Sequence, residues 1–144
     1  SSGGTQAGLI AGMIACKRPY PVYGIEVDGD PEPVTKMIKS IVSETIHKLG
    51  RFDEWQPEQD LKVITGFGGE NYGIPTKSGK EALELIARKE GILLDPVYSG
   101  KAFDGLISHI KQGLYNKDET VIFLHTGGAQ ALGAYPSVFL NAED

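Results

Sequence analysis

Segments with the pattern of a β-strand alternate with segments with the pattern of an α-helix along this 144-residue chain. The clearest helix is expected over residues 31–49, where apolar side chains recur every three or four positions and form one stripe. Short runs with β-branched and aromatic residues, at 21–29 and 61–67, predict strands before and after it. This alternation predicts an α/β fold with a mostly parallel sheet flanked by helices, over one segment that covers residues 1–144.

Further elements follow the same alternation. Three more segments predict helices, at 7–17, 76–90 and 101–112. Ser78 and Glu81 have the spacing of a capping box at the start of the second of them. The run TVIFLHT, residues 120–126, is apolar almost throughout, which predicts a strand inside a parallel sheet.

The composition excludes several classes of protein. A net charge of -5 argues against sequence-independent binding of nucleic acid, which needs a basic face. No apolar run reaches the roughly 18 residues of a membrane span, so no membrane segment is expected. The single cysteine, Cys16, cannot form an internal disulfide, which predicts a reducing, cytoplasmic location. We expect Cys16 to be a buried helical residue, with a reactive thiol as the alternative. The three histidines and the cysteine have no metal-ligand spacing, so no metal is expected.

Three polar, glycine-rich junctions recur, at residues 1–8, 95–101 and 125–130. In open α/β sheets ligands bind at the carboxyl ends of the strands, so these junctions are expected to converge on one ligand. The first of them, SSGGTQAG, precedes a helix, where free N–H groups and the helix dipole favour a phosphate. It lacks the lysine of a P-loop, and a flexible terminus or an ordinary turn is the alternative.

The other two junctions also have structural alternatives. In DPVYSGK, Pro96 holds Asp95 in extended geometry. The structural alternative is that Ser99 does no more than cap the helix and that Tyr98 is a core residue. In HTGGAQ, His125 is more typical of a hydrogen-bonded structural histidine than of a catalyst.

Four segments together resemble a known family. They are, in order, SSGGTQAGLIAG, ENYGIPT, EGILLDPVYSGKAF and FLHTGGA. With them the chain resembles the C-terminal half of pyridoxal-phosphate enzymes related to D-cysteine desulfhydrase and 1-aminocyclopropane-1-carboxylate (ACC) deaminase, in the tryptophan-synthase-β-like superfamily. The resemblance covers nearly the whole chain. It implies the C-terminal part of the large domain of a fold-type-II enzyme, with pyridoxal 5'-phosphate as the cofactor.

The resemblance also implies roles for individual residues. The residues matching the loop that holds the cofactor phosphate are Ser2, Gly3, Gly4 and Thr5. Ser99 matches the residue facing the pyridine nitrogen, and Thr126 and Gly127 match the wall near the ring. Tyr98 matches a tyrosine beside the substrate, for proton transfer or for placing its carboxylate, and Tyr72 matches a second active-site tyrosine.

One departure from the family narrows the expected chemistry. The deaminase that the chain resembles has a glutamate where this chain has Ser99. A carboxylate keeps the pyridine nitrogen protonated, whereas a neutral hydroxyl offers only a hydrogen bond and leaves a weaker electron sink. We therefore expect β-elimination from a cysteine-like amino acid, as in D-cysteine desulfhydrase, with L-cysteate sulfo-lyase or ACC deaminase activity as alternatives.

A second departure concerns the covalent anchor. Enzymes of this family bind the cofactor covalently through a lysine of the front half, and no segment of this chain matches that half. Lys17 and Lys101 have the wrong context for that lysine, because Lys17 follows a helix and Lys101 begins one. The chain is therefore expected to be a fragment with little activity by itself, from a homodimeric enzyme that acts on a small amino acid. A non-catalytic phosphate-binding or partner-binding module remains the alternative from another class. A Rossmann nucleotide-binding domain is disfavoured, since its acidic residue is missing from the expected place.

Overall fold

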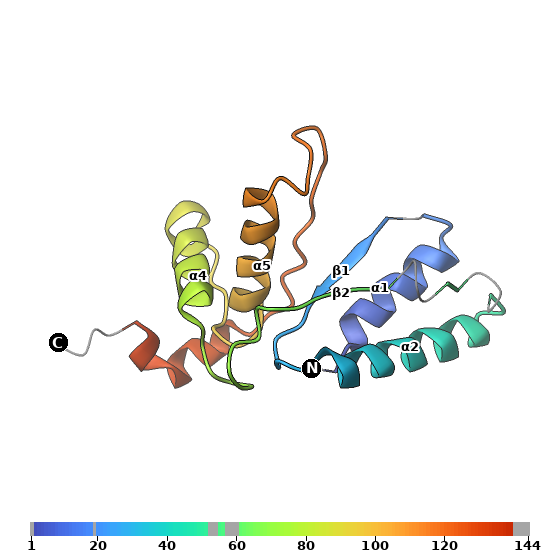
Figure 1. Ribbon diagram of the computed structural model, residues 1–144, viewed down its shortest axis with the longest axis horizontal. Helices are drawn as coiled ribbons and strands as arrows, with labels where there is room; N and C mark the ends of the chain where they lie inside the picture. Colours follow the sequence, from blue (N-terminus) through green and yellow to red (C-terminus); the bar gives the residue numbers. More distant parts are fainter. Residues whose placement is uncertain (1, 19, 52–54, 57–60, 140–144) are drawn as a thin grey trace. The chain divides into compact units, whose positions relative to one another are not determined.

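The computed structural model describes residues 2–18, 20–51, 55–56 and 61–139, and it divides into two compact units. Unit 1 comprises residues 1–26 and 30–65, and unit 2 comprises 27–29 and 66–144. Each unit is described by itself below. Together they give the expected α/β composition, with a parallel sheet and packed helices (Figure 1).

Unit 1 holds the sheet. Its elements are α1 (Gly4–Ala15), β1 (Val22–Ile25), α2 (Pro31–Lys48) and β2 (Leu61–Ile64). The two strands pair in parallel, with Val22 opposite Leu61 and Ile25 opposite Ile64. The helices pack against each other, and α1 packs on β1 while α2 packs on β2. The expected strands and the 31–49 helix are therefore confirmed, with shorter bounds.

The core of unit 1 lies between α1 and α2. Its buried side chains are Ala7, Ile10, Ala11, Ile38, Val42 and Ile46. The small residues of α1 let the two helices approach closely, while the apolar stripe of α2 supplies the bulk. The start of α2 matches the sequence, because the Asp30 carboxylate accepts a hydrogen bond from Glu32 N at 3.0 Å and Pro31 fills the first turn.

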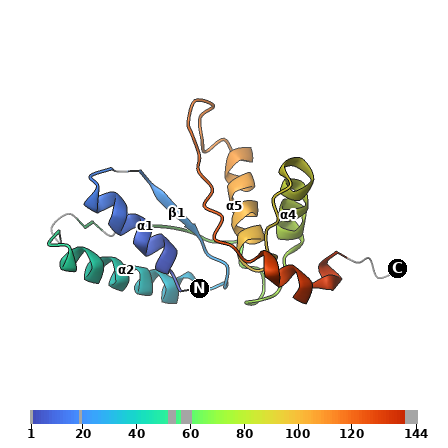
Figure 2. The same cartoon turned by 180° about the vertical axis from the view of Figure 1, so that it is seen from behind.

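Unit 2 is built on two helices that lie side by side in both views (Figures 1 and 2). These are α4 (Lys77–Glu90) and α5 (Ser99–Lys111), followed by two short 3-10 helices, η2 (Ala129–Ala134) and η3 (Pro136–Val138). Its core holds Leu83, Ile86 and Leu94, with Phe103, Phe123 and Leu132 packed on them. Gly91, at φ +68, ends α4 as a left-handed cap, and its N–H donates to Ala87 O at 3.1 Å.

Three local predictions were wrong. The cap of α4 is Thr76, whose hydroxyl accepts from Gly79 N at 3.0 Å, instead of a box of Ser78 and Glu81. Cys16 is exposed, because α1 ends one residue before it. Residues 120–126 form no strand, and Ile122 is 85% exposed. An apolar run becomes a strand only when neighbouring strands pair with it, and the described part of unit 2 provides none.

Candidate functional site

The glycine-rich opening forms the N-terminus of α1 in unit 1. Gly3 is the N-cap at φ +66, a left-handed conformation that suits glycine, and a β-carbon there would collide with the side chain of Ile38. The first intrahelical hydrogen bond runs from Ala7 N to Gly3 O at 2.9 Å. Among the described residues no side chain caps α1, and its first turn holds no acidic residue.

The first backbone N–H groups of α1 therefore have no cap from the side of Gly3. Ser2, Gly4 and Thr5 are exposed, so the hydroxyls and the bare backbone are accessible together. Uncapped N–H groups at the positive end of a helix dipole stabilise an anion. The assignment of residues 2–5 to a phosphate loop stays a prediction.

The DPVYS segment forms a tight turn around the Asp95 carboxylate in unit 2. One carboxylate oxygen accepts from the backbone N–H groups of Val97 and Tyr98, at 2.8 and 2.7 Å. The other accepts from Ser99 N at 2.8 Å and from the Ser99 hydroxyl at 2.6 Å. The Ser99 hydroxyl also accepts from Asp95 N at 2.8 Å. Asp95 therefore caps α5, and it fixes the orientation of Ser99 at the first helical position.

Asp95 is held in its ionised form. Burial raises the pKa of its carboxyl, but the hydrogen bonds from the Ser99 hydroxyl and from the backbone of Ser99, Tyr98 and Val97 together outweigh burial. The net pKa lies below its ordinary value. Asp95 is thus a buried anion, 1% exposed, at the start of a helix, where the dipole favours it.

Tyr72 and Tyr98 lie together in unit 2. Their hydroxyls are hydrogen-bonded to each other, and their ring centroids are 5.8 Å apart at an interplanar angle of 58°. Both side chains are exposed in part, at 56% and 38%, so Tyr98 is not a core residue. The hydrogen bond to Tyr98 raises the pKa of Tyr72 most, and desolvation and the charges of Tyr98, Asp28 and Tyr135 add to the effect. The Tyr72 phenol therefore stays protonated in the neutral range.

The turn at residues 125–128 packs against the Asp95 turn. Gly128, at φ +98, lies so close that a β-carbon would stand 2.8 Å from an Asp95 carboxylate oxygen. His125 is structural here: one ring nitrogen lies 3.1 Å from Leu93 O and the other accepts from Gly127 N at 3.1 Å. The first nitrogen therefore carries the proton. Thr126 and Gly127 are exposed beside this anchor.

The structure thus brings together the second and third junctions. In unit 2, Tyr98 is hydrogen-bonded to Tyr72 and directly precedes Ser99 in the chain. The Ser99 hydroxyl is hydrogen-bonded to Asp95. The turn that carries Thr126 and Gly127 packs against Asp95. The residues of the first junction, 2–5, lie in unit 1.

Sequence reasoning did not assign a role to Lys101. Its side chain is fully buried, and its ammonium group donates to Gly68 O at 2.5 Å and Val27 O at 3.4 Å. A lysine in the first turn of a helix is unfavourable, because its charge has the same sign as that end of the helix dipole. This unfavourable position was the available sequence signal that tertiary contacts hold Lys101. The ammonium group is enclosed by backbone carbonyls of its own unit.

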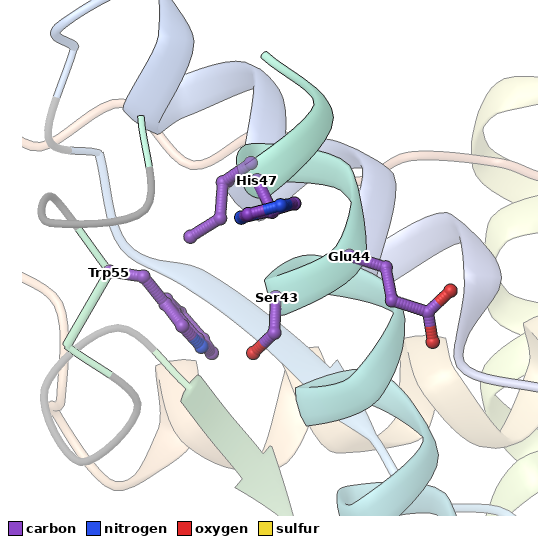
Figure 3. Close-up of a pocket in the computed structure, with 5 residues that line it drawn as sticks. Ser43, Glu44, His47 and Trp55 are labelled. Carbon is purple, nitrogen blue, oxygen red and sulfur yellow. The ribbon is translucent and has the colours of Figure 1, made fainter. Parts of the chain in front are cut away.

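Hollows elsewhere do not coincide with the candidate residues. One in unit 1, of about 400 Å³, is lined by Ser43, Glu44, Ile46, His47 and Trp55. In Figure 3 the Ser43 hydroxyl points toward the Trp55 ring, whereas the Glu44 carboxylate points away from it. Within the described ranges, no three His, Cys, Asp or Glu side chains gather as a metal site. None of the described helices has the length and apolar character needed to cross a membrane.

Comparison with known proteins identifies the family of this chain. The sequence pattern of the family called "Pyridoxal-phosphate dependent enzyme" matches residues 1–127. The chain belongs to this family. The match includes all nine residues that the resemblance assigned to the cofactor and the substrate. Pyridoxal 5'-phosphate, the expected cofactor, is the cofactor of the family.

Individual relatives point to one branch of the family. The chain is 39% identical over 142 residues to a 1-aminocyclopropane-1-carboxylate deaminase of Burkholderia cenocepacia strain HI2424 and 38% identical over 140 residues to one of Ralstonia nicotianae. Each alignment covers 97% of this chain and 41% of the relative. A crystal structure of an "ACC deaminase homologue" matches with a TM-score of 0.84 and 31% identity, over 95% of this chain and 40% of that one. The chain therefore spans about two fifths of the length of these relatives.

Proposed function

We propose that the complete protein is a pyridoxal-phosphate-dependent lyase that removes a β leaving group from a cysteine-like amino acid. The observation that carries this proposal is the Tyr72–Tyr98 hydroxyl pair beside the start of α5, next to the uncharged Ser99. A pair of hydrogen-bonded phenol hydroxyls can donate a proton to a leaving group or bind a carboxylate, and both tasks arise in amino-acid elimination.

The residues that the resemblance assigned to the cofactor are proposed to hold it. Ser2, Gly3, Gly4 and Thr5 would bind its phosphate with the open amides and hydroxyls at the start of α1. Ser99 would face its ring nitrogen, and Thr126 and Gly127 would line its ring. When bound, pyridoxal phosphate supplies an electron sink for the carbanion formed at Cα.

The side chains of unit 2 would then handle protons and orientation. Tyr98 is proposed to hold a proton at its hydroxyl, close to the leaving group or to the substrate carboxylate. Tyr72 keeps that hydroxyl in place through the hydrogen bond between the two phenols. For D-cysteine the balanced reaction consumes water and gives pyruvate, ammonia and hydrogen sulfide.

A second candidate, ACC deaminase activity, is favoured by the relatives' names. That reaction consumes water, opens the cyclopropane ring, and gives 2-oxobutanoate and ammonia. The two activities differ in their keto-acid product, so the product identifies the reaction. The proposed assembly is a homodimer acting on a small amino acid in the cytoplasm, and L-cysteate is an alternative sulfur substrate.

The test supplies the complete protein, loaded with pyridoxal phosphate, with D-cysteine, L-cysteate or ACC in separate reactions. We expect the unaltered protein to give pyruvate and sulfide from D-cysteine. We expect the Tyr98→Phe variant to bind the cofactor but to have a kcat lower by about tenfold or more. 2-Oxobutanoate from ACC as the main product would replace elimination by ring opening. Absence of any cofactor-dependent keto acid would overturn both candidates.

A further inference from the structure

Lys101 is the largest of the fully buried side chains that the structure describes. Its ammonium nitrogen donates to Gly68 O at 2.5 Å and to Val27 O at 3.4 Å. Moving a cation from water into a protein interior is unfavourable unless hydrogen bonds or charges compensate for the lost hydration. The contacts of Lys101 therefore compensate for the burial of its charge, and they connect separate segments of unit 2.

The hydrogen bond to Gly68 joins the two segments that carry the paired tyrosines. Lys101 lies three residues after Tyr98, in the first turn of α5, where Ala102 N donates to Tyr98 O at 2.9 Å. Gly68 lies four residues before Tyr72, in the chain between β2 and α4. One buried side chain thus links the start of α5 to the loop that carries Tyr72.

The segment around Gly68 has little freedom to move by itself. A β-carbon on Gly68 would stand 2.6 Å from Gly29 N, so this segment lies directly against another backbone segment of unit 2. At the next position, a β-carbon on Gly69 would stand 2.7 Å from Cγ2 of Thr76, the residue that caps α4. Because the loop is packed this closely, a displacement of Gly68 is expected to move Tyr72 as well.

The tyrosine pair itself lies near the surface. Tyr72 is 56% exposed and Tyr98 is 38% exposed, and their hydroxyls are hydrogen-bonded to each other. A hydrogen bond that water can replace contributes little to holding two segments together. The buried contact of Lys101 is shielded from such competition, so it can set the distance between the segments on which the hydroxyl contact depends.

We propose that Lys101 is a positioning residue of the site, which fixes the loop of Tyr72 against the start of α5 and so keeps the two phenol hydroxyls in contact. This inference rests on the proposed function, in which Tyr98 handles a proton or the substrate carboxylate and Tyr72 holds it in place. A reacting group that is misplaced by about 1 Å can lose on the order of a hundredfold in rate. Lys101 therefore affects catalysis through the tyrosines, since its own side chain is fully buried.

The titration of Tyr72 measures the position of the pair and does not require activity. The complete protein is labelled with ¹³C at the ζ carbon of its tyrosines, and the Tyr72 signal is identified by its loss in Tyr72→Phe. In the unaltered protein the hydrogen bond to Tyr98 raises the pKa of Tyr72 most. Lys101→Met should lower that pKa toward the ordinary value of 10.0, because the two hydroxyls separate. Ile86→Ala, a core truncation in α4, should destabilise the protein and leave the Tyr72 pKa unchanged.

A second measurement asks whether Lys101 acts through the tyrosines. Lys101→Met should lower kcat by about tenfold in the complete protein loaded with pyridoxal phosphate. In a Tyr98→Phe background the same substitution should lower kcat by less than about twofold, because the contact that Lys101 maintains is already lost. A purely structural role predicts the same loss in both backgrounds.

The outcomes separate this inference from the proposed function. An unchanged Tyr72 pKa in folded Lys101→Met overturns the role of Lys101, and so does an equal loss of kcat in both backgrounds. If Lys101→Met does not fold, Lys101→Gln, whose side chain is shorter but keeps an N–H donor, takes its place and the same two results decide. Failure of both variants to fold would make Lys101 a residue required for folding and would reject the positioning role. If Tyr98→Phe keeps its full kcat, the proposed function loses its proton donor, while the Tyr72 titration still tests Lys101.

Discussion

The Lys101 ammonium nitrogen lies 2.5 Å from the carbonyl oxygen of Gly68, inside unit 2. The same nitrogen lies 3.4 Å from Val27 O, so one lysine at the start of α5 contacts two segments that follow strands in the chain. Gly79 of α4 also lies beside this side chain, since a β-carbon there would stand at an ordinary contact distance of 3.5 Å from Lys101 Cγ. Since Ser99 lies two residues before Lys101, the lysine also ties the helix start that carries Ser99 to these segments.

Lys101→Met is expected to destabilise the protein by about 1–3 kcal/mol, because buried carbonyl oxygens lose their donor. Methionine has a similar length, so little packing is lost. The free energy of unfolding of the complete protein in urea measures the effect. The exposed Lys117→Met is the matched control and should change stability by less than about 0.5 kcal/mol. Equal stability of both variants would contradict a structural role for the Lys101 contacts.

Glycine substitutions in α1 distinguish the phosphate loop from the rest of its helix. Gly3→Ala should destabilise by about 1–2 kcal/mol from its left-handed backbone alone, and its β-carbon would also collide with Ile38. It should also weaken cofactor binding, because the start of α1 shifts. Gly8→Ala is the control: nothing lies within 4 Å of its new carbon, so it should stabilise the helix by about 0.5–1 kcal/mol. Urea unfolding and cofactor titration measure both, and a tolerated Gly3→Ala would argue against the assigned loop.

Much of this fold is readable from local sequence signals. The 31–49 helix was predicted correctly because its stripe, its Asp30 cap and its Pro31 agree with one another. The segments that resemble the family led to Tyr72, Tyr98 and Ser99, and two of the three junctions indeed adjoin. Local patterns succeed here because each one is satisfied by neighbours within a few residues.

The failures have the opposite cause. Residues 120–126 have the pattern of a buried strand, but strand formation depends on partners distant in sequence. The sequence around Lys101 does not show that this lysine is buried, because its partners, Val27 O and Gly68 O, are distant in sequence. The Asp95–Ser99 bond was also missed, although both residues stand in one short motif, because periodicity does not reveal which side chain points back at its own turn.

The Tyr72–Tyr98 pair predicts a measurable change in phenol titration. The hydrogen bond to Tyr98 is the first cause that raises the pKa of Tyr72, so Tyr98→Phe should lower the pKa of Tyr72 toward its ordinary value of 10.0. A raised pKa means that this contribution to stability is complete below pH 10.0 and is lost as the pH rises through the folded value.

Ultraviolet absorbance of phenolate, recorded against pH, follows this titration. Tyr20→Phe, which removes an exposed tyrosine of unit 1, is the control and should delete one phenol without moving the others. A Tyr72 titration that is the same with and without the Tyr98 hydroxyl would mean that the two phenols are not bonded in solution.

Asp95 predicts a loss of stability in acid. Burial raises the pKa of Asp95 and the hydrogen bonds from Ser99, Tyr98 and Val97 lower it further than burial raises it, so its folded pKa lies below the ordinary value of 3.8. Its contribution to stability is therefore present above pH 3.8 and is lost as the pH falls through the folded pKa.

Asp95→Asn should lower the free energy of unfolding by about 1–3 kcal/mol at neutral pH, because buried N–H groups lose acceptors. The deficit should shrink as the pH falls below 3.8, since the unaltered protein then loses the same carboxylate. Urea unfolding at a series of pH values measures the deficit. A deficit that stays constant into acid would show that the carboxylate charge at Asp95 does not stabilise the turn, and Asp30→Asn, at an exposed cap with one backbone bond, should show the smaller loss throughout.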